Sequence, residues 1–432
     1  MLRILILADD LSGAADCGVA CAGAGLKTFV ALRHTDEEPV ADVLSLDADT
    51  RSLAAEQAAK KIDQLMRGYA ANSDLLLFKK IDSTLRGNVG AELAAALRAL
   101  RDVRPGAPRR IAIMAPEFPA IGRTTIDGTQ FVHGQPLHNL DIWRVQGMNG
   151  HAHIPDMLQP FGLQCEVLGL DVIRSARSPL SDTMNAAAQI ADVLVCDAET
   201  DLDLMAIATA SMELDCRPIW VGSAGLAYQL PQAAGLVKRT HVAPKSLPPI
   251  GGPLLFVIGS LSRNSLEQVR ILSSSSATIE ICVPPEVLLA GEQHADWLVY
   301  AHELERAFRS NQDVVLSPKT EPRIDLAERP FIAAALARLA TTVARNAGAL
   351  IASGGETARA VFEALGISRL RLLGDLEKGI PISITENWSR PLPVITKAGD
   401  FGGASALLNC SRFLHREESR LVSARTSGKV IE

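Results

Sequence analysis

Short apolar runs alternate with stretches of helical periodicity along the first half of the chain. The run from Leu2 to Leu7 ends at two aspartates and is followed by an alanine-rich stretch that reaches Gly25, which predicts a strand, a loop and a helix. The same pattern predicts strands at 28–32, 43–46, 75–79 and 111–115 and helices at 54–69 and 89–100. Strands that alternate with helices indicate a mostly parallel, doubly wound α/β sheet.

Two segments interrupt this alternation. Residues 118–153 are rich in Gly, Thr, Gln and His and predict a long functional loop or a small subdomain. The segment between His241 and Pro253 contains four prolines and two glycines and predicts an interdomain linker. Because 432 residues are too many for one ordinary core, we expect two domains, at 1–243 and 254–432. Predicted strands at 254–258, 314–317, 349–353, 370–373 and 394–396 make the second domain α/β as well.

Composition narrows the classes of function. The chain is 47% hydrophobic and 21% charged, as compact globular proteins are, and carries a net charge of -6. Phosphate neutralisation needs clustered Lys and Arg, so no nucleic-acid partner is expected. No run reaches membrane-spanning length, and the first apolar run is too short for a secretory signal, so we expect no membrane partner and a cytoplasmic location. The seven cysteines contain no CxxC pair, and no metal centre is expected.

The first candidate site is Asp9-Asp10-Leu11-Ser12-Gly13, at the end of the first predicted strand. Carboxylates at the carboxyl end of a strand lie where open α/β sheets bind ligands, and such a group can bind substrate hydroxyls or act as a base. An N-cap role for Asp10 or Ser12 explains the same residues equally well.

The most informative segment runs from Lys79 to Glu92. Two lysines and an arginine lie beside Asp82, two hydroxyl side chains and two glycines, in a predicted turn from strand to helix. Helix N-terminal amides add to the attraction for an anion. A solvated charged loop with an ordinary capping box is the alternative, but charge this dense beside two glycines favours a functional site.

Further candidates follow along the chain. Arg123 can clamp a carboxylate or a phosphate, or it is a surface arginine in a turn. Three glycine-rich turns follow predicted strands in the second half, at 259–265, 353–357 and 397–403. Their amides lack Cβ crowding, which suits phosphate binding, although none has P-loop or Rossmann spacing. Together the three turns predict a nucleotide site.

Six motifs in this order resemble the four-carbon acid sugar kinase family. The N-terminal half contains ADDLSGAAD at 8–16, KIDSTLRGNVGAE at 80–92 and APEFPAIGRTT at 115–125. The C-terminal half contains GSLSRNSLEQ at 259–268, SGGETA at 353–358 and KAGDFG at 397–402. The matches run from about Leu2 to Leu407. The chain departs from the family where Ser12 replaces the usual Thr, and where Ala398 and Asp400 replace the more usual Ser and Asn.

The resemblance implies an N-terminal domain that binds a sugar acid and a C-terminal domain that binds ATP. The implied substrate contacts are Asp9 or Asp10, Arg51, Lys80, Ile81, Asp82 and Ser83. The implied ATP contacts are Ser260, Gly354, Gly355, Glu356, Thr357 and Gly402, to which the third glycine-rich turn adds Gly399.

The expected reaction is in-line phosphoryl transfer from Mg-ATP to the terminal hydroxyl of threonate, erythronate or 3-oxo-tetronate, with D-threonate favoured. Lys80, Arg51 or Arg86 is expected to hold the substrate carboxylate. Asp82, or one of the N-terminal aspartates, is expected to orient or deprotonate the hydroxyl. An active-site cleft between the two domains and a homodimer are also expected. The alternatives are a sugar-acid aldolase or dehydrogenase, and a non-catalytic sugar-acid sensor.

Overall fold

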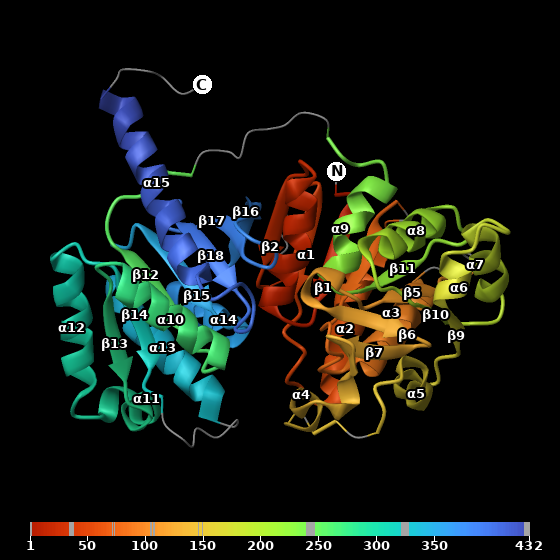
Figure 1. The fold of residues 1–432 in the computed structure, drawn as a ribbon, viewed down its shortest axis with the longest axis horizontal. Helices are drawn as coiled ribbons and strands as arrows, with labels where there is room; N and C mark the ends of the chain where they lie inside the picture. Colours follow the sequence, from red (N-terminus) through yellow and green to blue (C-terminus); the bar gives the residue numbers. More distant parts are fainter. Residues whose placement is uncertain are drawn as a thin grey trace. The chain divides into compact units, whose positions relative to one another are not determined.

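A computed structural model describes residues 2–33, 39–70, 72, 74–103, 106, 109–145, 147–148, 150–238, 247–320 and 328–426. The chain forms two compact units, Met1–His241 and Val242–Glu432, which Figure 1 shows in sequence colours. The first residues of the predicted linker, 241–246, lie outside the described residues.

The N-terminal unit is built on a parallel sheet. Its described strands follow the order β2-β3-β1-β4-β11-β5-β10-β9, and every neighbouring pair is parallel. Most of these strands are buried along their whole length, which explains why they appear in the sequence as continuous apolar runs. The strands are β1 (Ile4–Ala8), β2 (Thr28–Ala31), β3 (Val43–Asp47), β4 (Leu76–Lys80), β5 (Ala112–Ala115), β9 (Cys165–Leu168), β10 (Val193–Cys196) and β11 (Ile219–Gly222).

Helices cover both faces of this sheet (Figure 1). The chain leaves β1 and β3 in opposite directions across the sheet, and right-handed crossovers therefore place the helices that follow these two strands on opposite faces. One layer contains α1 (Leu11–Gly23), α8 (Asp201–Met212) and α9 (Ala224–Ala233), with α9 packed on both others. In the other layer α2 (Ala55–Ala70) packs on α3 (Val89–Val103). The shorter helices α6 (Leu170–Ile173) and α7 (Leu180–Ala188) lie near the β9 edge.

The segment predicted as a loop or small subdomain contains a small antiparallel sheet. Its strands are β6 (Arg123–Ile126), β7 (Thr129–Val132) and β8 (Gln135–Pro136), followed by α4 (Asp141–Val145) and α5 (Ile154–Leu158). Two-residue turns join the strands at Asp127-Gly128 and His133-Gly134, and all four residues have positive φ angles, as tight hairpins require. The Asp-Gly pair is the sequence signal from which this hairpin could have been predicted.

The C-terminal unit contains a second, mostly parallel sheet. Its described strands follow the order β13-β14-β12-β15-β18-β17-β16, in which only β17 runs against its neighbours. The strands are β12 (Leu254–Ile258), β13 (Ile279–Val283), β14 (Val314–Pro318), β15 (Ala349–Ser353), β16 (Arg369–Asp375), β17 (Pro381–Glu386) and β18 (Pro393–Lys397). The helices are α10 (Arg263–Ser275), α11 (Pro285–Ala290), α12 (Trp297–Arg309), α13 (Arg329–Ala344), α14 (Gly355–Leu365) and α15 (Ala406–Thr426). The prediction of α/β units with mostly parallel sheets is confirmed.

In the part of the chain that the structure describes, no helix combines the length and the apolar character that crossing a membrane needs.

Candidate active site

The N-terminal candidate residues lie at a topological switch point of the sheet. Strands β1 and β4 are neighbours, with Ala8 opposite Lys80, yet the chain leaves β1 toward β2 on one side and β4 toward β5 on the other. Open α/β sheets bind ligands in the crevice outside the carboxyl ends of such strands. Asp9 follows β1, Asp82 follows β4, and Arg51 follows the adjacent strand β3. Residues far apart in the sequence are therefore brought together at one edge of the sheet.

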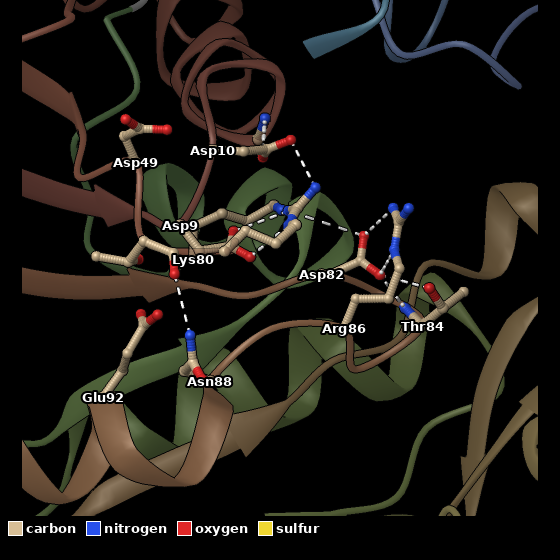
Figure 2. Close-up of polar contacts among 12 residues, drawn as sticks. Asp9, Asp10, Asp49, Lys80, Asp82, Thr84, Arg86, Asn88 and Glu92 are labelled. Atoms are coloured by element: carbon tan, nitrogen blue, oxygen red, sulfur yellow. Dashed lines mark hydrogen bonds and ion pairs between the residues drawn. The ribbon is translucent and has the colours of Figure 1, made fainter. Parts of the chain in front are cut away.

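The Arg51 guanidinium is the centre of this cluster. It donates to both carboxylate oxygens of Asp9, at 2.7 and 2.9 Å, and to Asp10 at 2.6 Å. A third carboxylate, that of Asp82, lies 3.9 Å from the same guanidinium, and Figure 2 shows Asp9, Asp10 and Asp82 converging on one point. Burial by itself raises the pKa of Asp9, but Arg51 and Lys80 outweigh burial and lower it. Arg51 is thus committed to the carboxylates of the protein.

Asp82 is held in a second fork, by Arg86. The Arg86 guanidinium donates to its two oxygens at 2.7 and 2.8 Å, and the Thr84 amide and hydroxyl donate to it as well. Burial opposes ionisation, but Arg86, Arg51 and Lys80 together hold the pKa of Asp82 well below its usual range. Asp82 is therefore a carboxylate at neutral pH, in a fixed orientation.

Lys80 is the cation of the cluster that protein groups do not satisfy. Its side chain is buried, and in the described part of the chain its ammonium has no hydrogen bond or ion pair. Burial by itself lowers the pKa of Lys80, but the nearby acidic groups, led by Asp9, outweigh burial and raise it. A Cβ atom at Gly13 would lie 2.6 Å from the Lys80 ammonium, so a larger residue there would displace the end of the lysine side chain. Lys80 is a buried cation available to an anionic ligand.

The rest of the predicted substrate segment has mixed roles. The Ile81 side chain belongs to the hydrophobic core, so only its backbone can contact a ligand. Ser83 is buried, and its carbonyl oxygen accepts a hydrogen bond from the Gln130 side chain at 2.9 Å. Gln130 in turn accepts one from Thr125, at 2.8 Å. Gln130 lies on strand β7, so the small antiparallel sheet supports the candidate site.

Gln130 and Asn88 were missed as candidate site residues. Asn88 donates to the carbonyl oxygens of Thr50 and Leu53, at 3.0 and 2.9 Å, and so ties the segment after β4 to the segment after β3. Asn88 lies inside the segment predicted to be functional, which was the available signal. Arg123, predicted to bind substrate, begins β6 of the small sheet.

The buried carboxyl group of Glu117 is expected to make the stability of the fold depend on pH. Glu117 follows β5 and is fully buried; burial raises the pKa of its carboxyl well above its usual range and outweighs the opposing effect of the Thr125 hydroxyl. Above about pH 4.5 the unfolded chain ionises at this position while the folded chain does not, so stability falls as pH rises. Glu117→Gln is therefore expected to raise the free energy of unfolding at pH 8 by on the order of 1–3 kcal/mol, with little effect at pH 4.5.

Denaturant unfolding of both proteins at pH 4.5 and pH 8 measures this difference. Glu166→Gln, at an exposed position on β9, is the matched control and is expected to change stability little at either pH. A Glu117→Gln effect of the same size at both pH values would contradict the buried neutral carboxyl.

The three glycine-rich turns of the C-terminal unit also lie together at the carboxyl ends of neighbouring strands. They follow β12, β15 and β18, which are neighbouring parallel strands. The chain leaves β12 toward β13 on one side and β15 toward β16 on the other, a second switch point. A Cβ atom at Gly259 would collide with the Thr357 hydroxyl, and one at Gly399 with the Ser260 hydroxyl. The turns thus touch one another, and glycine permits their close approach.

The predicted nucleotide contacts lie on these turns. Gly354 is the N-cap of α14 and has a φ angle of +103°, and its amide donates to the Lys397 carbonyl oxygen at 2.8 Å. Gly355, Glu356 and Thr357 form the first turn of α14, where unpaired amides favour an anion. Gly402, with a φ angle of +81°, lies on the turn after β18. Across the described residues, no group of three or more His, Cys, Asp and Glu side chains gathers to hold a metal ion.

Both halves of the chain match models of known domains. A sugar-binding N-terminal domain model matches residues 4–230, and a nucleotide-binding C-terminal domain model matches residues 255–407. The chain is 40% identical to the D-threonate kinase of Cupriavidus necator, over 97% of this chain and 99% of that protein. It is 30% identical to the D-threonate kinase of Salmonella typhimurium, over 96% of this chain and 99% of that protein.

A solved Haemophilus influenzae protein shares the fold, with a TM-score of 0.71 at 20% identity over 95% of this chain and 100% of that chain. The family resemblance inferred from the six motifs is confirmed by the two domain models and by a relative of 40% identity over nearly the full length. The chain therefore belongs to the four-carbon acid sugar kinase family.

Proposed function

We propose that this protein transfers the γ-phosphoryl group of ATP to the terminal hydroxyl of D-threonate, giving 4-phospho-D-threonate. One observation in the N-terminal unit carries the proposal. Lys80 is a buried ammonium without a hydrogen bond or ion pair among the described residues, whereas the neighbouring Arg51 and Arg86 are paired with protein carboxylates. A free buried cation beside ionised carboxylates suits a ligand with a carboxylate at one end and hydroxyls at the other.

Within this proposal each side chain has a defined task. Lys80 binds the substrate carboxylate, and Asp9, Asp10 and Asp82 accept hydrogen bonds from the substrate hydroxyls. Arg51 and Arg86 hold these acidic groups in place. Of the three residues that the sequence offered for the substrate carboxylate, this assignment keeps Lys80 and gives Arg51 and Arg86 the support of Asp9 and Asp82.

The lowered pKa of Asp82 bears on the mechanism. A carboxylate that is this easily ionised is a weak base, so Asp82 orients the attacking hydroxyl and takes its proton late. Phosphoryl transfer through a loose transition state tolerates a weak base, because positioning and charge neutralisation supply most of the catalysis. Mg²⁺ bound with ATP would neutralise charge on the transferring group. The glycine-rich turns of the C-terminal unit bind the ATP phosphates.

An ADP-release assay tests the function directly. ADP release is expected to depend on D-threonate, and kcat/KM is expected to be higher for D-threonate than for L-threonate, D-erythronate or 3-oxo-tetronate. A higher kcat/KM for one of the other acids would assign the protein to that substrate. Ligand binding without ADP release would favour the sensor alternative. The cleft between the two domains, the homodimer and the cytoplasmic location stay predictions from the sequence.

A further inference from the structure

The turn from Ala398 to Gly403 is held in place by hydrogen bonds that side chains donate to its carbonyl oxygens. Each of these six consecutive carbonyls accepts at least one hydrogen bond from a side chain. The donors come from Lys397, at the end of β18, and from the first turns of α10. In turns exposed to solvent, most carbonyl oxygens accept hydrogen bonds from water. A complete set of side-chain donors therefore indicates that the protein holds this turn in one conformation.

Lys397 supplies three of these hydrogen bonds. Its ammonium donates to the carbonyl oxygens of Ala398, Gly399 and Phe401, at 3.0, 2.7 and 3.2 Å. Only 1% of the residue is exposed, and burial lowers the pKa of Lys397 to about 8, against the opposing effect of Asp400. The three N–H groups of the ammonium are thus matched by three carbonyls, and none is left for a ligand.

Three polar side chains of α10 supply the other donors. The Gln268 amide lies 3.1, 3.3 and 3.0 Å from the carbonyl oxygens of residues 401, 402 and 403. Asn264 donates to those of residues 400 and 402, at 3.0 and 3.1 Å, and Ser265 to that of residue 399, at 2.7 Å. Residues 264, 265 and 268 share one face of a helix, which allows all three to reach the turn.

The direction of the carbonyls fixes the direction of the amides. In a planar trans peptide the N–H points away from the preceding C=O. In the described residues, the amides of Gly399, Asp400, Gly402 and Gly403 donate no hydrogen bond, while that of Phe401 donates to Ala398. Free amides that follow one another in a turn form a concave site for an anion.

We propose that Lys397, Gln268 and Asn264 are positioning residues that direct the amides of the 398–403 turn toward the phosphates of ATP, and that the Lys397 ammonium does not itself contact the nucleotide. The inference rests on the proposed ATP site and adds to it the residues that shape it. A buried lysine at the end of a strand beside a phosphate site would ordinarily be assigned to direct phosphate binding. Here its donors are already used by the backbone.

The test compares the affinities for ATP and for adenosine, measured by calorimetric titration. Amides that bind phosphate contribute to ATP affinity and not to adenosine affinity. Lys397→Met and Gln268→Leu keep the side-chain size and remove the donors, and each is expected to weaken ATP binding about tenfold or more while adenosine binding changes by less than about twofold. Asn264→Ala, at a half-buried position, is expected to show a smaller loss of the same kind. The exposed Lys319→Met is the matched control and is expected to bind both ligands as the parent does.

ATP affinity within about twofold of the parent in the folded variants would overturn the proposal. An equal loss of ATP and adenosine affinity would also overturn it, because it indicates a general structural role. If the two buried variants lack a cooperative unfolding transition, Asn264→Ala decides alone. Failure of the parent protein to bind ATP contradicts the proposed function itself, which separates the two questions.

Discussion

Asp82→Asn is expected to lower kcat for D-threonate phosphorylation by about 100-fold or more. Asparagine keeps the size of the side chain but removes the negative charge proposed to accept the substrate hydroxyl proton. It also leaves the Arg86 guanidinium without the carboxylate to which it donates at 2.7 and 2.8 Å. Steady-state kinetics at saturating ATP and D-threonate, with thermal unfolding of the same samples, measure the effect. Turnover at the parental rate would show that Asp82 is not the group that orients or deprotonates the hydroxyl.

The surface of α2 offers a matched control for this substitution. Asp63 accepts a similar fork from Arg67, four residues further on, at 2.7 and 3.1 Å, but Arg67 is exposed and lies in the last turn of α2. Asp63→Asn removes the same type of i,i+4 ion pair. Exposed pairs of this kind contribute about 0.3–0.5 kcal/mol to stability. Asp63→Asn is therefore expected to leave kcat unchanged, so a loss confined to Asp82→Asn reports on the site.

Lys80→Met is expected to raise the KM for D-threonate by about 10- to 100-fold, because one charge-assisted hydrogen bond to a carboxylate is lost. Methionine fills a similar volume and leaves Arg51 to hold Asp9 and Asp10. ATP affinity is expected to stay at the parental value, because the glycine-rich turns proposed to bind ATP lie in the other unit. KM measurements for D-threonate and ATP titrations of the same variant test both statements.

Threitol, which lacks the carboxylate, makes this test specific. The parent protein is expected to use D-threonate far better than threitol, and Lys80→Met is expected to lose most of that preference. Lys60→Met, at an exposed position of α2, is the control and should retain it. An unchanged preference in Lys80→Met would show that another group binds the carboxylate.

The sequence predicted the strands that form continuous apolar runs. Continuous apolar runs such as Ile4–Ala8 and Leu254–Ile258 are fully buried strands, and both were predicted. The strands β13 and β17 were missed. In β13, buried and exposed positions alternate over only five residues, which is a weak signal for an edge strand. The hairpins of the small sheet were also missed, although Asp127-Gly128 signals a tight turn.

The candidate site was predictable where residues follow strands directly. Asp9 and Lys80 lie at the ends of neighbouring parallel strands, so their proximity follows from the order of strands and helices. The contacts that distinguish their roles join residues far apart in the chain. Arg51 binds Asp9 across 42 positions, and Gln268 binds Phe401 across 133. Such pairings depend on the folded arrangement of loops, and the pattern of residues along the chain does not contain them.

The position of the phosphate in the product tests the central claim most directly. The protein is incubated with ATP, Mg²⁺ and D-threonate, and the product is examined by ³¹P and ¹H NMR. We predict one new phosphate ester, coupled to the two protons on C4. A phosphate on C2, C3 or the carboxylate, or ADP formation without a phosphorylated acid, would contradict the account.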